Sequence, residues 1–518
     1  MKQGVLPFNY EEEKKDFGTT AVAGILLYLD LLKQMSFGQM VSRHVVAKEN
    51  KQGWSDYRFL LGVMLLNICG GDCVDDINKL ENDGGLRRIF KNLELRNAFG
   101  RRRQKLIRQW RNGKRNAFPS SSSIFRYLLL FHNSDQEVLR QEYDGKSRAF
   151  IPLSNRFLLG LCGVNKSMLE FLQLHNPQEV ATIDMDATIV ASQKEQALYS
   201  YKKCKGYQPL NAWWWEQDYL VYTEFRDGNV PAGFEQKRVF CETLSCLPPG
   251  VEKVYLRSDT AGYQHNLLRY CELGENERFG RIEFAIGCDV TPEFKKEVFQ
   301  VSESEWHPIF RELKGELKET GQEWAEVPFV PNAIGHSKKG PSYRYIGIRE
   351  VLKQRELPGI ECQQSFPFPT MAMNDKKYKL FGLVSNMDWE GESLIHWSRK
   401  RCGNSEHVHS EMKESFAGGQ LPSGKFGANA AWWWLMVMAL NLTSMMKCLA
   451  LSGLPGSGKN NWEGSRMKKI RFWLINIPGR VILEGKELII RLTRGHPAFE
   501  LFVNVRRRIA LLGALSPG

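Results

Sequence analysis

Acidic residues in three separate parts of the chain have the type and setting needed to bind metal ions. They are Asp184 and Asp186 in the apolar run ATIDMDATIV, Asp259 at the end of VEKVYLRSD, and Glu406 in RCGNSEHVHSEMK. Carboxylates from separate elements can hold two divalent ions at one point. Such a metal pair can break and rejoin phosphodiester bonds by in-line displacement at phosphorus. The residues therefore suggest metal-dependent phosphoryl transfer.

Each of the first two acidic positions also has a structural interpretation. Strand alternation places Asp184 and Asp186 on one face, which is costly unless the charges are paired or bind metal. Neutralisation by Lys202 or Lys205 is the alternative. Asp259 follows a predicted strand at the edge where α/β sheets bind ligands, although an N-cap of the next helix is the simpler explanation for this residue alone.

The stretch around Glu406 is predicted to be helical. Glu406, His409 and Lys413 then lie on one stripe, where a carboxylate and a lysine suit metal and phosphate together. His407 and His409 do not share a helix face, which disfavours a zinc site.

A Gly-rich segment, GLPGSGKN from Gly453 to Asn460, has the spacing of a phosphate-binding loop. Asn460 stands where Ser or Thr would bind magnesium, and an apolar helix precedes the segment in place of a strand. A flexible linker is therefore preferred over a nucleotide-hydrolysing loop as the interpretation of this segment.

The composition favours a polyanion as the partner. The chain of 518 residues has a net charge of +13 and a pI near 9.1, and its length predicts two to four domains. The segment Gly100–Asn116 contains no acidic residue and includes Trp110. A basic segment with an aromatic side chain suits a phosphate backbone, with a solvated helix face as the alternative. The predicted DNA contacts in it are Arg101, Arg102, Arg103, Lys105, Arg108 and Arg111.

The cysteine pattern and the first residues indicate a reducing compartment. The 11 cysteines are irregularly spaced, and the start of the chain lacks the apolar segment of a secretory signal. We therefore expect reduced thiols in a cytoplasmic protein. The most apolar stretch, Ala428 to Lys447, is interrupted by polar residues, and its uninterrupted part is too short to span a bilayer. It predicts a buried core helix, and no membrane partner is expected.

Apolar spacing divides the chain into a helical start and a mixed centre. Stretches such as TAVAGILLYLDLLKQM and YRFLLGVMLLNIC predict helices, and the Gly84–Gly85 pair is expected to close a further helix. From about Glu179, strands and helices alternate, which predicts a mixed α/β sheet. The predicted regions are a helical DNA-binding region (1–150), the first part of the core (151–302), a β-rich insertion (303–390), the second part of the core with the Glu406 helix (391–450) and a basic C-terminal subdomain (451–518).

Together these stretches resemble bacterial insertion-sequence transposases of the Asp-Asp-Glu class, in the branch with a β-strand insertion domain before the catalytic glutamate. The similar stretches run from about Thr182 to Trp434 and include TIDMDATIVAS, KGYQPLNAWWWEQ, YTEFRDGNVPAG, VYLRSDTAGYQ and RCGNSEHVHSEMKESFAGGQLPSGKFGANAAWWW. The resemblance implies an RNase H-like catalytic core. The expected fold class is therefore α/β, with a β-rich insertion and a mostly helical N-terminal DNA-binding region.

The resemblance also implies the metal-binding residues. Asp186, Asp259 and Glu406 would form a triad for two Mg²⁺ or Mn²⁺ ions, with Asp184 as the rival for the first position. The separations are 73 residues (259 − 186) and 147 residues (406 − 259). The longer one falls where this branch carries its insertion.

The family's signature around the glutamate matches only in part. Lys413 matches the lysine position, whereas Cys402 stands at the arginine position and Arg399 at the tyrosine position. Arg401 lies beside Cys402. Arg399, Arg401 and Lys413 are expected to contact DNA phosphate.

Two functional hypotheses of different classes follow from these observations. The first is a DNA transposase that binds the terminal inverted repeats of its element, cuts DNA strands and transfers them to target DNA, as at least a dimer in a synaptic complex. The second is an element-end DNA-binding protein or repressor without catalysis.

Overall fold

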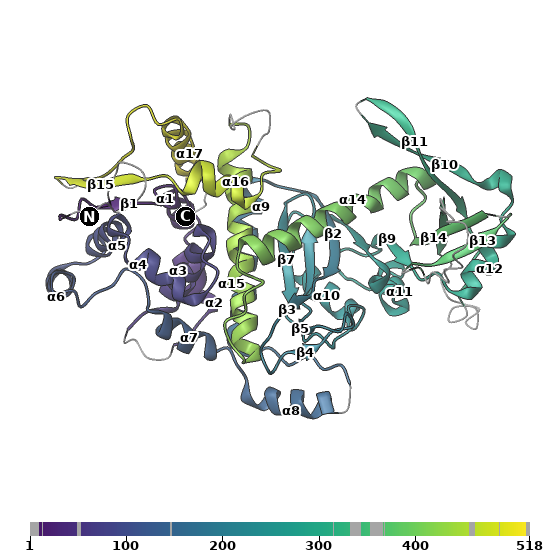
Figure 1. The fold of residues 1–518 in the computed structure, drawn as a ribbon, viewed down its shortest axis with the longest axis horizontal. Helices are drawn as coiled ribbons and strands as arrows, with labels where there is room; N and C mark the ends of the chain where they lie inside the picture. Colours follow the sequence, from purple (N-terminus) through teal and green to yellow (C-terminus); the bar gives the residue numbers. More distant parts are fainter. Residues whose placement is uncertain are drawn as a thin grey trace.

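Three regions follow one another along the longest axis of the molecule (Figure 1). A helical region with both chain ends lies at one end, a central sheet follows, and a β-rich lobe lies at the other end. The computed structural model describes residues 10–12, 14–48, 53–145, 148–313, 315–331, 343–352, 366, 368–374, 376–454, 462–485 and 487–513. The predicted Gly453–Asn460 segment lies outside the described residues from position 455 onwards.

The predicted helical start of the chain is confirmed. Its helices are α1 (Ile25–Gln34), α2 (Phe37–His44), α3 (Asp56–Cys69), α4 (Ile77–Glu81), α5 (Gly84–Arg96), α6 (Gly100–Arg111), α7 (Ser121–Leu129), α8 (Ser134–Gly145) and α9 (Arg156–His175). With the exception of α8, their apolar faces pack into the same continuous core cluster as the central sheet.

The prediction that Gly84–Gly85 closes a helix is wrong. The helix before this pair has already ended, and Asp83 caps α5 by accepting a hydrogen bond from the backbone N–H of Leu86 at 2.8 Å. Gly85 lies at the start of α5 because a neighbouring strand packs directly on it. A Cβ on Gly85 would lie 2.7 Å from the side chain of Thr20.

A mixed sheet forms the centre of the molecule, as the sequence predicts. Its central strands are β2 (Val180–Ala187), β6 (Leu210–Trp214), β7 (Tyr219–Glu224), β8 (Lys253–Ser258) and β9 (Glu283–Cys288), in the spatial order β7-β6-β2-β8-β9. β2, β8 and β9 are parallel, whereas β6 is antiparallel to both of its neighbours. α10 (Gln236–Cys246) and α11 (His265–Glu272) make the crossovers that parallel strands need.

The stretch predicted as a β-rich insertion holds strands that continue the central sheet. In its described part these are β10 (His307–Leu313), β11 (Glu316–Glu326), β12 (Arg344–Val351), β13 (Thr370–Met373) and β14 (Lys376–Ser385). β14 pairs with β9, so the two parts form one ten-stranded sheet. The sequence predicts β12 and β14 but not β10 and β11, because most side chains of that hairpin are exposed and polar.

Two long helices lie against the sheet. α14 (Gly391–Ser410) continues into a π-helical turn over Glu411–Ser415, and α15 (Phe426–Met445) follows. Every residue of α15 is buried, which confirms the predicted core helix. By length and composition the segment Phe426–Leu451 could cross a membrane, but 83% of its most apolar window is buried inside the protein. α15 packs on α3, α9 and β7 and so joins the helical region to the sheet.

The two ends of the chain pack together in the helical region (Figure 1). The last elements are α16 (Met467–Ile470), β15 (Gly479–Glu484), β16 (Glu487–Arg491) and α17 (Ala498–Leu512). β15 pairs with β1 (Thr19–Thr20), and α17 packs on α1. The predicted C-terminal subdomain therefore shares a small sheet and a helix interface with the start of the chain.

Candidate active site

Asp184 is one half of a buried ion pair. Its two oxygens accept hydrogen bonds from Nε and Nη2 of Arg257 at 2.6 and 2.8 Å, and both side chains are 1% exposed. Burial raises the pKa of Asp184 to about 6, although Arg257 opposes the shift. Arg257, and neither Lys202 nor Lys205, neutralises this aspartate. Because both oxygens are engaged, the structure does not support Asp184 as a metal ligand.

Arg257 also ties the sheet to α14. Its guanidinium lies between the rings of Trp215 and Trp397, 4.8 and 4.9 Å from their centroids. Nη1 donates a hydrogen bond to the main-chain carbonyl of Trp397 at 2.9 Å. The pair of Asp184 and Arg257 therefore fixes β2, β8 and α14 relative to one another.

Asp186 and Asp259 lie next to one another at the carboxyl ends of β2 and β8. Met185 pairs with Ser258 in the parallel ladder, so the next residue of each chain segment is an aspartate. Burial raises the pKa of both carboxyls, and the charge of Asp186 raises the pKa of Asp259 further. Two half-buried carboxylates that repel one another provide a site for a shared cation. Asp259 is also an N-cap, since its Oδ1 accepts from the N–H of Ala261 at 3.0 Å.

Arg401 of α14 places a positive charge beside this pair. Its Nη1 lies 3.1 Å from Oδ2 of Asp186, and its charge opposes the rise in the pKa of both aspartates. The hydroxyl of Ser405, one turn further along the helix, also acts to lower the pKa of Asp186. Trp397, Arg401 and Ser405 follow at four-residue spacing and form the face of α14 that meets the sheet.

Glu406 does not join the two aspartates. It is exposed, because Ser405 faces the sheet and the next side chain points about 100° further round the helix. Within the residues that the structure describes, no three His, Cys, Asp or Glu side chains are placed to hold a metal ion. Asp186 and Asp259 thus fit a cation, whereas the third predicted ligand stays apart in this conformation.

The other basic residues predicted near Glu406 lie on either side of Arg401 along the chain. Lys413 is half-buried in the π-helical turn after α14. The predicted α-helical stripe therefore ends at Ser410, since the π-turn is wider than an α-helical turn. Arg399 is half-buried, and burial lowers its pKa, while Glu350 of β12 is among its charged neighbours.

A buried chain of hydrogen bonds holds the end of α14 against β6 and β7. Trp433 Nε1 donates to the hydroxyl of Thr223 at 2.9 Å. That hydroxyl donates to Oδ1 of Asn211 at 2.7 Å, and Nδ2 of Asn211 lies 3.2 Å from Nε2 of His409. Burial lowers the pKa of His409 to about 4, so its Nε2 accepts the hydrogen bond. Asn211 is the ladder partner of Asp186, which links this chain to the carboxylates.

Acidification is expected to destabilise the protein through His409. The pKa of its imidazole is about 4 in the folded protein, against 6.5 for a free histidine. Between these values the unfolded chain takes up a proton that the folded protein does not. The contribution of neutral His409 to the free energy of unfolding is complete above pH 6.5. It falls by roughly 3 kcal/mol as the pH decreases towards the pKa of the folded protein. Urea unfolding midpoints across this range measure the loss, and His409→Gln should flatten the profile. An unchanged profile in that variant would contradict the assignment.

The predicted basic residues of α6 are all exposed. Arg101, Arg102, Arg103, Lys105, Arg108 and Arg111 lie on the solvent side of the helix. Trp110 instead anchors α6: it is 7% exposed, and its Nε1 donates to Glu94 at 2.9 Å. The interpretation of Trp110 as an aromatic contact for nucleic acid is therefore wrong, because the ring is part of the core. The exposed row of guanidinium groups remains available to a polyanion.

Arg257, Trp397 and Ser405 are site residues that the sequence reasoning missed. One signal could have identified the first of them. Arg257 precedes Asp259 by the same two residues by which Asp184 precedes Asp186. In parallel neighbouring strands, matched spacing of this kind places arginine opposite the first aspartate and the two remaining aspartates opposite one another.

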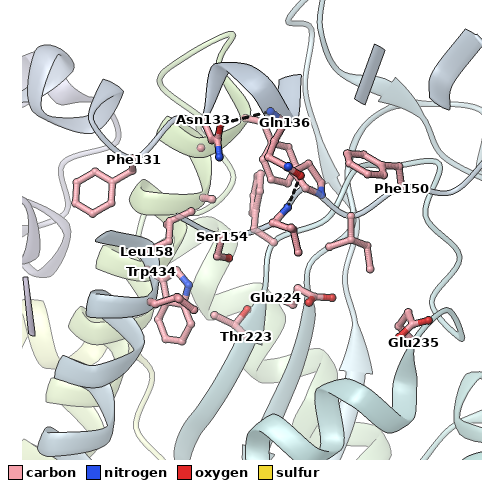
Figure 2. Close-up of a pocket in the computed structure, with 18 of the residues that line it drawn as sticks. Phe131, Asn133, Gln136, Phe150, Ser154, Leu158, Thr223, Glu224, Glu235 and Trp434 are labelled. Atoms are coloured by element: carbon pink, nitrogen blue, oxygen red, sulfur yellow. Dashed lines mark hydrogen bonds between the residues drawn. The ribbon is translucent and has the colours of Figure 1, made fainter. Parts of the chain in front are cut away.

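A cavity of about 680 Å³ lies between α9, β7 and α15, with residues 149–154 along its rim. Figure 2 shows Phe131, Phe150 and Trp434 around it, with Glu224 and Glu235 on one side. Arg226 and Arg238 pair with Glu224. None of the predicted catalytic residues lines this cavity. It is therefore a feature separate from the aspartate pair.

Comparison with known proteins identifies the family. A family model described as transposase DDE domain group 1 matches residues 18–514. No curated protein matches the chain. Among solved structures, the chain is similar to the piggyBac transposase in a cryo-EM structure of its synaptic complex with hairpin DNA, at 10% identity and a TM-score of 0.38, over 87% of this chain and 78% of that one. Since the family model spans nearly the whole sequence, the chain belongs to the DDE-domain transposases of group 1, a family of phosphoryl-transfer enzymes.

Proposed function

We propose that the protein is a DNA transposase that cuts and joins DNA at the terminal inverted repeats of its own insertion sequence. The observation that carries this proposal is the meeting of Asp186 and Asp259 at neighbouring parallel strand ends, in a chain of the DDE family. The strand order β7-β6-β2-β8-β9, with three parallel strands and an antiparallel β6, fits the RNase H-like core that we propose for residues of the central sheet.

The side chains around the aspartates have distinct tasks in this proposal. Asp186 and Asp259 would hold the divalent ions, Mg²⁺ or Mn²⁺, with Glu406 as the third ligand, and such ions supply an activated oxygen nucleophile and charge stabilisation at phosphorus. Arg399, Arg401 and Lys413 neutralise phosphate charge beside them. Asp184 and Arg257 keep the two strands in register, so that the aspartates retain their spacing.

A cleavage assay tests this function. The purified protein is incubated with duplex DNA that carries the inverted repeats flanking its gene, in Mg²⁺, in Mn²⁺ and in a chelator. The expected products are nicks at the repeat ends in either metal and none in the chelator. Joining of the freed 3′ ends to a second duplex would extend the result to strand transfer. The synaptic complex is expected to contain at least two copies of the chain.

The second candidate is an element-end DNA-binding protein that does not cut. One observation favours it: Glu406 is exposed and stands apart from the aspartate pair. Specific binding of the repeats without nicks in either metal would support this candidate and overturn the first.

The triple variant Arg101→Gln, Arg102→Gln, Arg103→Gln is expected to bind DNA about 10²-fold more weakly at roughly 0.1 M salt. The three guanidinium groups are exposed, so the substitutions remove charges that can neutralise phosphates and leave the fold unchanged. The slope of log affinity against log salt should become shallower by about 0.9 for each phosphate that the variant no longer neutralises. Fluorescence anisotropy of a labelled duplex over a salt series measures both quantities.

The control for this prediction removes the same charge elsewhere. Lys296, Lys318 and Lys376 are exposed residues of the β-rich lobe. Their triple glutamine variant should keep a salt slope close to that of the natural protein. Equal effects in both variants would mean that net charge, and not α6, determines the affinity.

A further inference from the structure

We propose that Arg401 is an exchangeable counter-ion, which pairs with Asp186 in the free protein and with a DNA phosphate in the complex. Metal binding and DNA binding then favour one another. A metal ion at Asp186 frees Arg401 for a phosphate, and a phosphate that binds Arg401 frees Asp186 for the metal ion. This inference rests on the proposed function and assigns to one residue the coupling between its two ligands.

The first step of the argument is competition for one carboxylate. Nη1 of Arg401 lies 3.1 Å from Oδ2 of Asp186, and its charge also acts on Asp259. A guanidinium in this position compensates the same negative charge that a divalent ion would compensate. A cation that binds Asp186 must therefore displace Arg401, and the free energy of the ion pair is subtracted from the binding of that cation.

The second step is the contrast between Arg401 and Arg257, the two arginines that pair with aspartates of β2. The Arg257 side chain is 1% exposed, contacts both oxygens of Asp184 and stacks between two tryptophan rings. The Arg401 side chain is 11% exposed, and among the described residues a single hydrogen bond is found for its guanidinium. Arg257 is thus locked in place, whereas Arg401 can change partner by a change of rotamer.

The third step is the surface that Arg401 adjoins. It ends the basic run Arg399-Lys400-Arg401 on α14, and Lys400 is exposed. A DNA backbone lying on this run offers Arg401 a phosphate in place of Asp186, and guanidinium groups bind phosphate well. Transfer of Arg401 to phosphate leaves Asp186 uncompensated and raises its affinity for a cation. By linkage, the metal must raise the affinity for DNA by the same factor.

The deciding experiment measures metal binding without DNA and without catalysis. Mn²⁺ is titrated calorimetrically into the full-length natural protein and into the variants Arg401→Gln, Lys400→Gln and Asp186→Asn. Arg401→Gln should bind Mn²⁺ about tenfold more tightly, because no ion pair has to be broken. Lys400→Gln removes the same charge from an exposed neighbour and should change the affinity less than about twofold. Asp186→Asn should abolish the binding.

A second titration measures the coupling itself. The ratio of Ca²⁺ affinities with and without element-end duplex should fall about tenfold in Arg401→Gln relative to the natural protein. Arg401→Lys, which keeps the charge and preserves the fold if glutamine does not, should behave like the natural protein in both titrations.

The outcomes separate this inference from the proposed function. Asp186-dependent Mn²⁺ binding that is unchanged or weaker in Arg401→Gln overturns the inference and leaves the transposase proposal intact. Equal increases in affinity in Arg401→Gln and Lys400→Gln also overturn it, since they reduce the effect to net charge. Failure of the natural protein to bind Mn²⁺ at Asp186 overturns both.

Discussion

The variant Asp259→Asn is expected to nick element-end DNA about 10³-fold more slowly than the natural protein. An amide has no charge with which to hold a cation, and Asp186 alone cannot position one between the two strands. The fold should be unaffected, because asparagine caps the turn at Ala261 as well as aspartate does. Stability should even rise slightly, because the variant removes a half-buried charge that lies beside Asp186.

The measurement combines single-turnover nicking in Mg²⁺ with urea unfolding of the same preparations. The matched control is Asp289→Asn. Asp289 is exposed and follows β9, the next parallel strand of the sheet, so it tests whether any carboxylate at this edge is needed. It should cut at the normal rate. Full activity of Asp259→Asn, or equal loss of activity in both variants, would contradict the assignment of Asp259.

The variant Arg257→Met is expected to lower the free energy of unfolding by about 3–5 kcal/mol. The substitution leaves the Asp184 carboxylate buried at 1% exposure without its partner. It also removes the hydrogen bond to the Trp397 carbonyl and the stacking on two rings, which hold α14 on the sheet. The first urea transition measures the decrease, since a chain of this size need not unfold in one step.

Two further variants decide whether the unpaired charge is the cause. The double variant Asp184→Leu, Arg257→Met removes both charges and should recover most of the missing stability. Lys253→Met breaks a pair with Glu283 on the neighbouring strand, but this lysine side chain is 52% exposed, so the cost should stay below about 1 kcal/mol. A double variant as unstable as Arg257→Met would show that packing against the tryptophans, and not the charge, dominates.

Local signals in the sequence predicted those elements whose burial is complete or whose caps are explicit. The apolar stretch at Ala428–Lys447 became α15. A threonine followed by proline, as at Thr291 and Pro292, is typical of a helix start. The helix α12 (Pro292–Gln300) begins there, and the Thr291 hydroxyl accepts a hydrogen bond from the N–H of Phe294 at 3.2 Å. The prediction that Gly84–Gly85 closes a helix was wrong, because glycine is used where backbones pack closely as well as at helix ends.

The sequence predicted the part of the candidate site that lies at the ends of strands. Alternation and strand ends singled out Asp184, Asp186 and Asp259, and the family resemblance favoured Asp186 over Asp184 as the metal ligand. The positions of these aspartates depend on backbone register alone. The partner of Asp184 was not predicted, although Arg257 stands two residues before Asp259 just as Asp184 stands two residues before Asp186. The parallel register of β2 with β8, which brings the two together, was not part of the prediction. The orientation of Glu406 depends on how α14 rotates against the sheet. The side chains that set this rotation are Trp397, Arg401 and Ser405. None of them lies on the helical face that contains Glu406, His409 and Lys413.

The pairing of the two chain ends has a consequence for the order of events during synthesis. α1 is complete at Gln34, but α17, which covers it, begins only at Ala498. At about 5–20 residues per second, the ribosome needs roughly half a minute to a minute and a half to make the intervening chain. Throughout that interval α1 lacks the partner for one apolar face, and for nearly all of it β1 lacks its neighbour β15. The helical region therefore cannot reach its final packing before α17 has been synthesised and has left the ribosome.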